Sequence, residues 1–262
     1  MLTLSLLLHW ILIAITIAGI GFAIVWAICV RVKNYSFLDV AWSYGVAVLA
    51  PIYAWFGPGH FERKLAFTLL GVVWSLRLGT YLLLRVLRHH PAEDVRYEAL
   101  RQRWPGSGMF LLFFELQALL VVIFSLPFLL AAWRSMPLRE IDLAGLGIAA
   151  LALAGEALAD RQMKRFKADA ANKGQVCEVG LWQYSRHPNY FFEFLFWVGI
   201  FIASADHPHG WITVLCPLLM YYFLTRVTGI PLTEAYSLKS KGDAYREYQR
   251  RTSAFFPWFR KR

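Results

Sequence analysis

Gly180-Leu-Trp-Gln-Tyr-Ser-Arg-His-Pro-Asn-Tyr-Phe-Phe-Glu193 leads directly into the apolar run from Phe194 to Ala203. Lipid contact alone poorly explains a short polar segment with a proline in it at the mouth of a membrane span. Pro188 has no backbone N–H and disfavours helical geometry in the residue before it, so we predict a helix that begins near Asn189. The stretch therefore indicates a site at the entrance to a span.

The side chains of this stretch are suited to binding a nucleotide. Arg186 and His187 precede the predicted helix, where free N–H groups and the helix dipole favour a bound phosphate. Asn189 and Glu193 share one face of the helix. The simpler interpretation is a helix cap, with Arg186 and His187 extended to lipid headgroups. A cap does not require so many polar side chains, and we favour a binding site.

Composition places the chain among membrane proteins. Hydrophobic residues make up 58% of 262 positions, charged residues only 17%, and the mean hydropathy is +0.46. The net charge of +10 comes from basic residues in short segments between apolar runs, which is typical of the positive-inside pattern and not of nucleic-acid binding. Cys29, Cys177 and Cys216 have no metal-type spacing, so we expect neither a metal site nor a disulfide framework.

Apolar runs predict an all-α, polytopic membrane bundle of about seven transmembrane helices. The first run is too long, and lacks the basic start, for a cleaved secretion signal. No repeat or flexible linker interrupts the chain, so we expect a single membrane domain over 1–262 with a tail at 228–262. The predicted spans are 2–30, 40–56, 65–86, 109–133, 141–159, 190–205 and 211–227.

Charges in the loops predict the orientation. The segments 31–38, 87–107, 160–183 and the tail carry most of the Lys and Arg residues, and 206–210 carries none. Because basic loops remain in the cytoplasm, we predict an N-terminus outside, a cytoplasmic C-terminus and a cytoplasmic Gly180–Glu193 stretch. The expected location is a bacterial inner membrane, in contact with membrane lipids.

Ionisable residues within spans are further site candidates, because they are costly in lipid. Asp39 opens the second span, where a helix N-cap is the simpler interpretation. Trp74 and Arg77 lie midway along the third span, and Arg77 requires a carboxylate partner or an anionic ligand, with Asp39 and Glu115 as the nearest acidic candidates.

A carboxylate followed by basic residues closes the fifth predicted span. Asp160 precedes a segment that contains Lys164 and Lys167. This segment could bind anionic lipids. It could equally form a pocket in which the cations hold phosphates and Asp160 accepts hydrogen bonds from amide or hydroxyl groups.

The tail contains a second aromatic and basic strip. Pro231 predicts the start of a helix, and in a following helix Tyr245, Tyr248 and Arg251 lie along one face. The tail could lie in the membrane interface, with Phe255, Phe256 and Trp258 as anchors. It could equally fold back over the Gly180–Glu193 stretch.

Two motifs resemble a known family. Gly-Leu-Trp-x-Tyr-Ser-Arg-His-Pro-Asn-Tyr-Phe-x-Glu at 180–193 and Tyr-x-x-Tyr-x-x-Arg-Thr-Ser-x-Phe-x-Pro at 245–257 are similar to the bacterial DUF1295 branch of the steroid 5-alpha-reductase superfamily. The resemblance extends from Asp39 onward and is strongest in the last part of the chain. It implies a seven-span membrane enzyme that uses NADPH to reduce the activated C=C bond of a lipid or steroid-like enone.

The resemblance also implies roles for individual residues. NADPH contacts fall at Asp160, Lys167, Tyr184, Asn189, Glu193, Arg226 and Tyr236, and our own interpretation of the motifs adds Lys164, Arg186, His187, Tyr190, Glu234, Tyr248 and Arg251. The carbonyl-activating Glu and Tyr of the steroid enzymes correspond approximately to Asp39 and Trp74, neither of which is the family's own residue. We expect burial to keep Asp39 protonated, with Tyr44 or Tyr81 as candidates for the missing phenol.

Two other functions fit parts of the pattern. Arg186, His187, Tyr190, Arg226 and Glu234 also resemble positions of the isoprenylcysteine carboxyl methyltransferases, which use S-adenosylmethionine. A lipid-binding or scaffold protein is a third interpretation, but it leaves the intramembrane polar residues without a purpose. The sequence has no Gly-x-Gly-x-x-Gly fingerprint, so a dinucleotide would have to be held by helices and loops.

Overall fold

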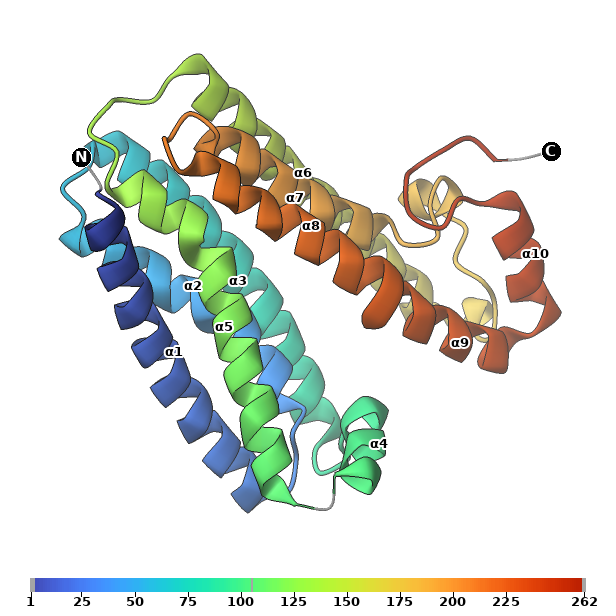
Figure 1. The fold of residues 1–262 in the computed structure, drawn as a ribbon. Helices are drawn as coiled ribbons and strands as arrows, with labels where there is room; N and C mark the ends of the chain where they lie inside the picture. The colour runs from blue at the N-terminus through green and yellow to red at the C-terminus, as the bar shows by residue number, and fades with distance from the viewer. Residues whose placement is uncertain (1–2, 105, 261–262) are drawn as a thin grey trace. The chain divides into compact units, whose positions relative to one another are not determined.

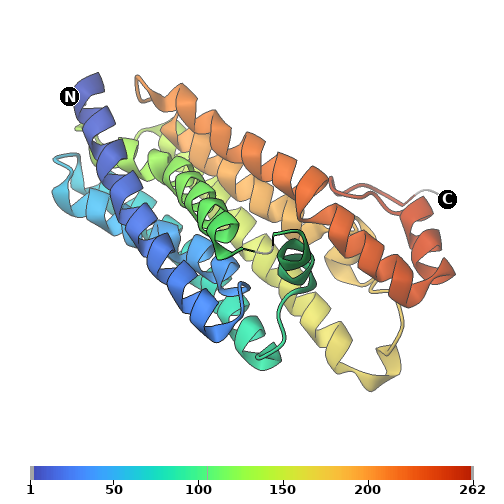
Figure 2. The same ribbon diagram turned by 60° about the horizontal axis from the view of Figure 1, so that its bottom comes forward.

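The computed structural model describes residues 3–104 and 106–260 (Figures 1 and 2). Its contacts group the chain into two compact units. Unit 1 comprises Met1–Arg139 and His207–Thr213, and unit 2 comprises Glu140–Asp206 and Val214–Arg262. The single domain expected over 1–262 stays a prediction, as does the orientation of the termini.

The all-α membrane fold is confirmed. Among the described residues, six helical segments are long and apolar enough to cross a membrane: Leu4–Val32, Phe37–Phe56, Phe61–His89, Ser107–Ala132, Glu140–Ala168 and Gly210–Lys241. The predicted span 190–205 corresponds to Pro188–Ser204, an apolar helix of 17 residues that is shorter than the other six segments. The protein is therefore an integral, multi-pass membrane protein.

Unit 1 is built from four long helices and one short one. α1 (Leu4–Val32) packs on α5 (Ser107–Ala132), and α2 (Phe37–Phe56) packs on both α3 (Phe61–His89) and α5. The short α4 (Val95–Arg103) follows α3 and lies outside the apolar spans. The rings of Phe67, Phe114 and Phe124 are almost completely buried in this unit.

A side chain from α3 enters the hydrogen-bond ladder of α2. The Ser75 hydroxyl accepts from the Ala47 N–H (3.0 Å) and donates to the Ser43 C=O, the two groups that pair directly in an ideal helix. One turn further along, Pro51 has no N–H to donate. Insertion of a side chain into the ladder is a recognised cause of helix bending.

Unit 2 is centred on the close crossing of α6 (Glu140–Ala168) and α7 (Pro188–Ser204). A Cβ on Gly145 would lie 2.4 Å from the Ala203 N, and one on Gly199 would lie 2.6 Å from the Gly145 O. Only glycine permits the two backbones to approach this closely, as in other membrane helix pairs with small residues at the contact. The short helices η1 (Ala170–Asn172) and η2 (Gly180–Gln183) connect α6 to α7.

Two helices continue beyond the ends of the predicted spans. The fifth span was expected to end at 159, but α6 continues to Ala168, so Asp160, Lys164 and Lys167 are helical. The last span was expected to end at 227, but the helical path continues to Lys241. Hydropathy marks where a segment stops being apolar, and a helix continues beyond that point when its polar residues are good helix formers.

The last helical path contains a local irregularity. It runs through η3 (Gly210–Val214), α8 (Leu215–Tyr222), the π-helical turn η4 (Phe223–Val227) and α9 (Ile230–Lys241), with α10 (Asp243–Arg251) after it. The Thr228 N–H donates to the Phe223 C=O (2.9 Å), which is the wider pairing of a π turn. Pro231 lies in the first turn of α9, as the sequence predicted.

The helix crossing gives a test of the fold. Gly199→Ala places a methyl group against the α6 backbone, so we expect the free energy of unfolding to fall by about 1–3 kcal/mol. Gly147→Ala is the matched control on α6, because its Cβ would meet nothing within 4 Å. Thermal unfolding in detergent, followed by tryptophan fluorescence, measures both; equal midpoints for the two variants would contradict the close crossing.

Candidate functional site

The tail folds back over the segment that precedes α7. Ser185 and Ser253 form a parallel bridge, in which the Arg186 N–H donates to the Ser253 C=O (2.8 Å). The Trp258 N–H donates to the Tyr184 C=O (2.9 Å), and the Ser185 hydroxyl donates to the Phe255 C=O (2.9 Å). Of the two sequence interpretations, the structure has the one in which the tail covers the motif.

Glu234 on α9 joins the motif to the tail. Its Oε1 accepts from the Arg186 Nε (2.6 Å) and lies 3.2 Å from the His187 Nε2, and its Oε2 accepts from the Gln249 Nε2 (2.8 Å). The Arg186 Nη1 also donates to the Gln249 and Thr252 carbonyls, at 2.9 and 2.6 Å. The polar groups of this cluster thus satisfy one another, which is the condition for burying an ion pair.

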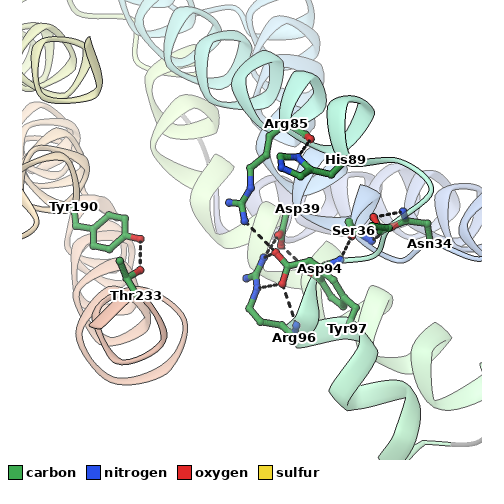
Figure 3. A network of polar contacts seen from close by, with 11 residues as sticks. Asn34, Ser36, Asp39, Arg85, His89, Asp94, Arg96, Tyr97, Tyr190 and Thr233 are labelled. Atoms are coloured by element: carbon green, nitrogen blue, oxygen red, sulfur yellow. Dashed lines mark hydrogen bonds and ion pairs between the residues drawn. The ribbon is translucent and has the colours of Figure 1, made fainter. Parts of the chain in front are cut away.

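His187 is buried between Glu234 and an aromatic ring. Its imidazole stacks on Tyr190 with centroids 5.3 Å apart and ring planes at 4°. The Tyr190 hydroxyl hydrogen bonds to the Thr233 hydroxyl (3.2 Å; Figure 3). Burial lowers the pKa of His187 below its usual value, although Glu234 acts in the opposite direction.

A line of candidate residues runs along the end of α6. Asp160, Lys164 and Lys167 are spaced so that they lie on one face of the helix, with the two lysines exposed. The short helix η2 is hydrogen bonded to the same end of α6. The Leu181 N–H donates to the Gln162 Oε1 (2.9 Å), and the Trp182 Nε1 donates to the Ala159 C=O (3.0 Å). Two lysine ammonium groups and a carboxylate therefore share one face of α6.

Asn189 connects this line to the start of α7. Its Nδ2 donates to the Asp160 Oδ1 (3.3 Å). Its Oδ1 is buried and has no hydrogen-bond donor among residues 3–104 and 106–260. Native proteins satisfy most buried acceptors, and an unsatisfied one costs about 1–3 kcal/mol. The amide oxygen of Asn189 is thus suited to an external donor.

The other predicted cofactor residues are dispersed over unit 2. The Glu193 Oε1 accepts from the Trp197 Nε1 (3.0 Å), the Tyr248 hydroxyl donates to the Trp182 C=O, and Arg251 pairs with Glu178 (3.5 Å). These three groups have partners within the chain. Arg226, Tyr184 and Tyr236 are exposed, with Tyr236 at 73% and Arg226 in the π turn η4.

In unit 1, Asp39 pairs with the segment after α3. Its Oδ2 accepts from the Arg96 Nη2 (2.5 Å) and its Oδ1 from the Tyr97 hydroxyl (2.7 Å; Figure 3). Asp39 is not the N-cap of α2, because Ser36 occupies that position. Both carboxylate oxygens accept hydrogen bonds, an arrangement that fits an anchoring role, and the catalytic role of Asp39 stays a prediction.

The Asp39 contact belongs to a larger polar network. Arg96 also donates to Asp94 (2.9 Å), whose backbone N–H donates to the Ser36 hydroxyl (2.8 Å; Figure 3). Burial raises the pKa of the Asp94 carboxyl, but the Arg96 hydrogen bonds outweigh it, and the pKa is lowered. Burial, reinforced by Asp39, raises the pKa of Tyr97 well above its usual value.

Sequence reasoning missed Arg96 and Tyr97, because the segment 87–107 was considered only for its charge. The available signal was an aromatic residue, Tyr97, directly after Arg96 in an otherwise polar segment. The phenol that contacts Asp39 is Tyr97, whereas Tyr44 hydrogen bonds to Thr80 (3.0 Å). Glu115 lies against α1, with its Oε2 3.0 Å from where a Cβ on Gly19 would be.

Trp74, the second predicted catalytic residue, is completely buried. Its ring meets Trp42 edge to face, with centroids 6.2 Å apart. Among the residues described, no group of His, Cys, Asp and Glu has the arrangement of a metal site.

The Glu234 cluster predicts a large loss of stability on mutation. Glu234→Gln leaves the half-buried Arg186 without its carboxylate, so we expect the free energy of unfolding to fall by about 3 kcal/mol. Asp243→Asn is the matched control, because Asp243 pairs with Arg246 on the surface and its side chain is 94% exposed. Denaturation midpoints measure the difference, and a control as unstable as Glu234→Gln would refute a central role for this carboxylate.

His187 predicts a pH dependence. In the folded chain the pKa of His187 lies below its usual value of 6.5, so the unfolded chain binds a proton first as the pH falls. The contribution of the neutral imidazole to stability is therefore complete above about pH 6.5 and is lost as the pH falls below it. His187→Phe retains a ring on Tyr190 and cannot titrate, so its melting temperature should fall less than the wild type between pH 7.5 and 5.5. His89→Gln, at an exposed histidine, should retain the wild-type slope; an unchanged slope in His187→Phe would argue against the buried neutral imidazole.

Comparison with known proteins places these residues in a family. A model of the DUF1295 family, described as proteins of unknown function, matches residues 25–252. An uncharacterized protein of Schizosaccharomyces pombe is 26% identical over 266 aligned residues, which cover 89% of this chain and 76% of the relative. No solved structure matches the chain. The protein is a member of the DUF1295 family.

Proposed function

We propose that the protein is a membrane-embedded, NADPH-dependent reductase of the activated C=C bond of a lipid or steroid-like enone. The observation that carries the proposal is the Asp160–Asn189 pair, in which the buried Asn189 Oδ1 has no donor among the described residues. A nicotinamide carboxamide or a ribose hydroxyl supplies such a donor. The resemblance to the steroid 5-alpha-reductase superfamily supports the same assignment.

The cations of α6 fit the rest of the nucleotide. Lys164 and Lys167 follow Asp160 along one helix face, about 6 and 10 Å further along the axis at 1.5 Å per residue. Both lysines are exposed, so their ammonium groups are available to phosphate oxygens. Asp160 and Asn189 would hold the amide or ribose, and Lys164 and Lys167 the phosphates.

The proposed reaction is a hydride transfer followed by a protonation. When bound, NADPH supplies the hydride that forms the new C–H bond at the β carbon, and it leaves as NADP⁺. A proton added at the α carbon completes the reduction. The resemblance assigns the activation of the enone carbonyl to Asp39 and Trp74.

A methyltransferase that uses S-adenosylmethionine is a second candidate. Arg186, His187, Tyr190 and Glu234, four of the positions shared with the isoprenylcysteine enzymes, form one cluster of contacts. However, Glu234 already has three partners within the chain, whereas Asn189 retains an acceptor. We therefore favour the reductase.

Cofactor titration tests the proposal. We expect purified protein in detergent to show energy transfer from tryptophan to bound NADPH, and S-adenosylmethionine not to compete. Asn189→Ala should weaken NADPH binding by about tenfold, since one hydrogen bond to a buried group is lost. Asn172→Ala is the control, because its amide donates to the Phe166 C=O beyond the proposed site. Preferential binding of S-adenosylmethionine would replace the reductase by the methyltransferase.

A further inference from the structure

Trp42 on α2 is held edge-on by two aromatic rings of unit 1. Its ring lies 6.2 Å from that of Trp74 at 80°, and 5.4 Å from that of Phe124 at 78°. Trp74 and Phe124 are themselves completely or almost completely buried, so packing fixes their positions. Edge-to-face contacts on two sides fix the plane of the Trp42 indole.

The indole N–H of Trp42 is a buried hydrogen-bond donor without a partner in the part of the chain that the structure describes. It has no acceptor among residues 3–104 and 106–260. Other indole N–H groups have one: Trp26 donates to the Ser107 C=O (3.0 Å) and Trp182 to the Ala159 C=O (3.0 Å). Because buried donors are paired in most native structures, an exception requires an explanation.

The acceptors nearest along α2 are already engaged. The Asp39 carboxylate accepts from Arg96 and Tyr97, and the Asp39 C=O accepts from the Ser43 hydroxyl (2.8 Å). The Ser43 C=O accepts from the Ser75 hydroxyl that enters the α2 ladder. The Trp42 N–H is thus left without an acceptor in the part of the chain that the structure describes, and an external acceptor can fill that place.

We propose that Trp42 is a substrate-binding residue, whose N–H donates to the carbonyl oxygen of an apolar ketone. A ketone oxygen accepts and does not donate, so it matches a site that offers an indole N–H. In apolar surroundings such a hydrogen bond is stronger than in water, and it draws electron density toward the oxygen. The identification of the ketone as an enone rests on the proposed reductase function.

The assignment also accounts for the engagement of Asp39. Trp42 lies one turn after Asp39, on the same face of α2. Asp39 binds Arg96 and Tyr97 and so anchors α4 to the start of α2. Trp42 is the nearby residue whose donor has no partner among the described residues. The hydrogen bond to the substrate oxygen is thus assigned to an indole and not to a carboxylic acid.

A paired-ligand experiment tests the proposal without nucleotide. A 4-ene-3-ketosteroid and its 3-deoxy analogue are titrated into purified protein in detergent by equilibrium dialysis. We expect the wild type to bind the ketone at least about tenfold more tightly than the deoxy compound, as one unsatisfied buried donor implies. Trp42→Phe should remove this preference by weakening the ketone alone, and Trp26→Phe should retain it.

Stability without ligand provides a second readout. Trp42→Phe removes a donor that has no acceptor among the described residues, so the loss in melting temperature should come from ring packing alone. Trp182→Phe loses packing and also the hydrogen bond to the Ala159 C=O, and should melt lower than Trp42→Phe. If Trp42→Phe melts as low as Trp182→Phe, the indole has a partner within the chain and the proposal is overturned.

The outcomes separate this proposal from the reductase function. Absence of a ketone preference in the wild type, or its persistence in Trp42→Phe, overturns the Trp42 site even if NADPH binds. Failure to bind NADPH, together with a Trp42-dependent ketone preference, overturns the reductase and leaves the ketone site in place.

Discussion

The pairing of Arg186 with Glu234 is the interaction on which unit 2 depends. A guanidinium buried beside apolar helices is tolerated only when its donors find acceptors, and here a carboxylate and two tail carbonyls provide them. One ion pair therefore determines where α9 and the tail lie relative to the start of α7. Asp160 and Asn189, which belong to the same unit, are held beside this cluster through α6 and α7.

Hydropathy was sufficient to predict the spans, because an apolar run of membrane length has few alternatives to a helix. Hydropathy did not predict how far two helices extend beyond their apolar runs. α6 continues through Asp160 and Lys167, and the last helical path continues to Lys241, although neither segment is apolar. Local signals such as Pro188 and Pro231 did predict the starts of α7 and α9, since proline acts within its own turn.

Tertiary pairing of polar residues was less accessible from the sequence. Asp39 and Arg96 are 57 residues apart, and no periodicity connects them. Reasoning from the spans gave Asp39 and Glu115 as candidate partners of Arg77, because all three occur in apolar segments. It overlooked Arg96 and Tyr97, the partners of Asp39 in the segment after α3. Within a single helix the reasoning was better, since the shared face of Asp160, Lys164 and Lys167 follows from helix geometry once the helix extends that far.

The parallel bridge between Ser185 and Ser253 has a consequence for biosynthesis. Residues 184–186 precede their partners at 252–258 by more than sixty positions, so α6 and α7 are made long before the segment that completes the bridge. Until Glu234 has also been made, Arg186 and His187 can be solvated only by water or lipid headgroups. Assembly of this region is therefore a late event, which follows the emergence of residues 252–258 from the ribosome.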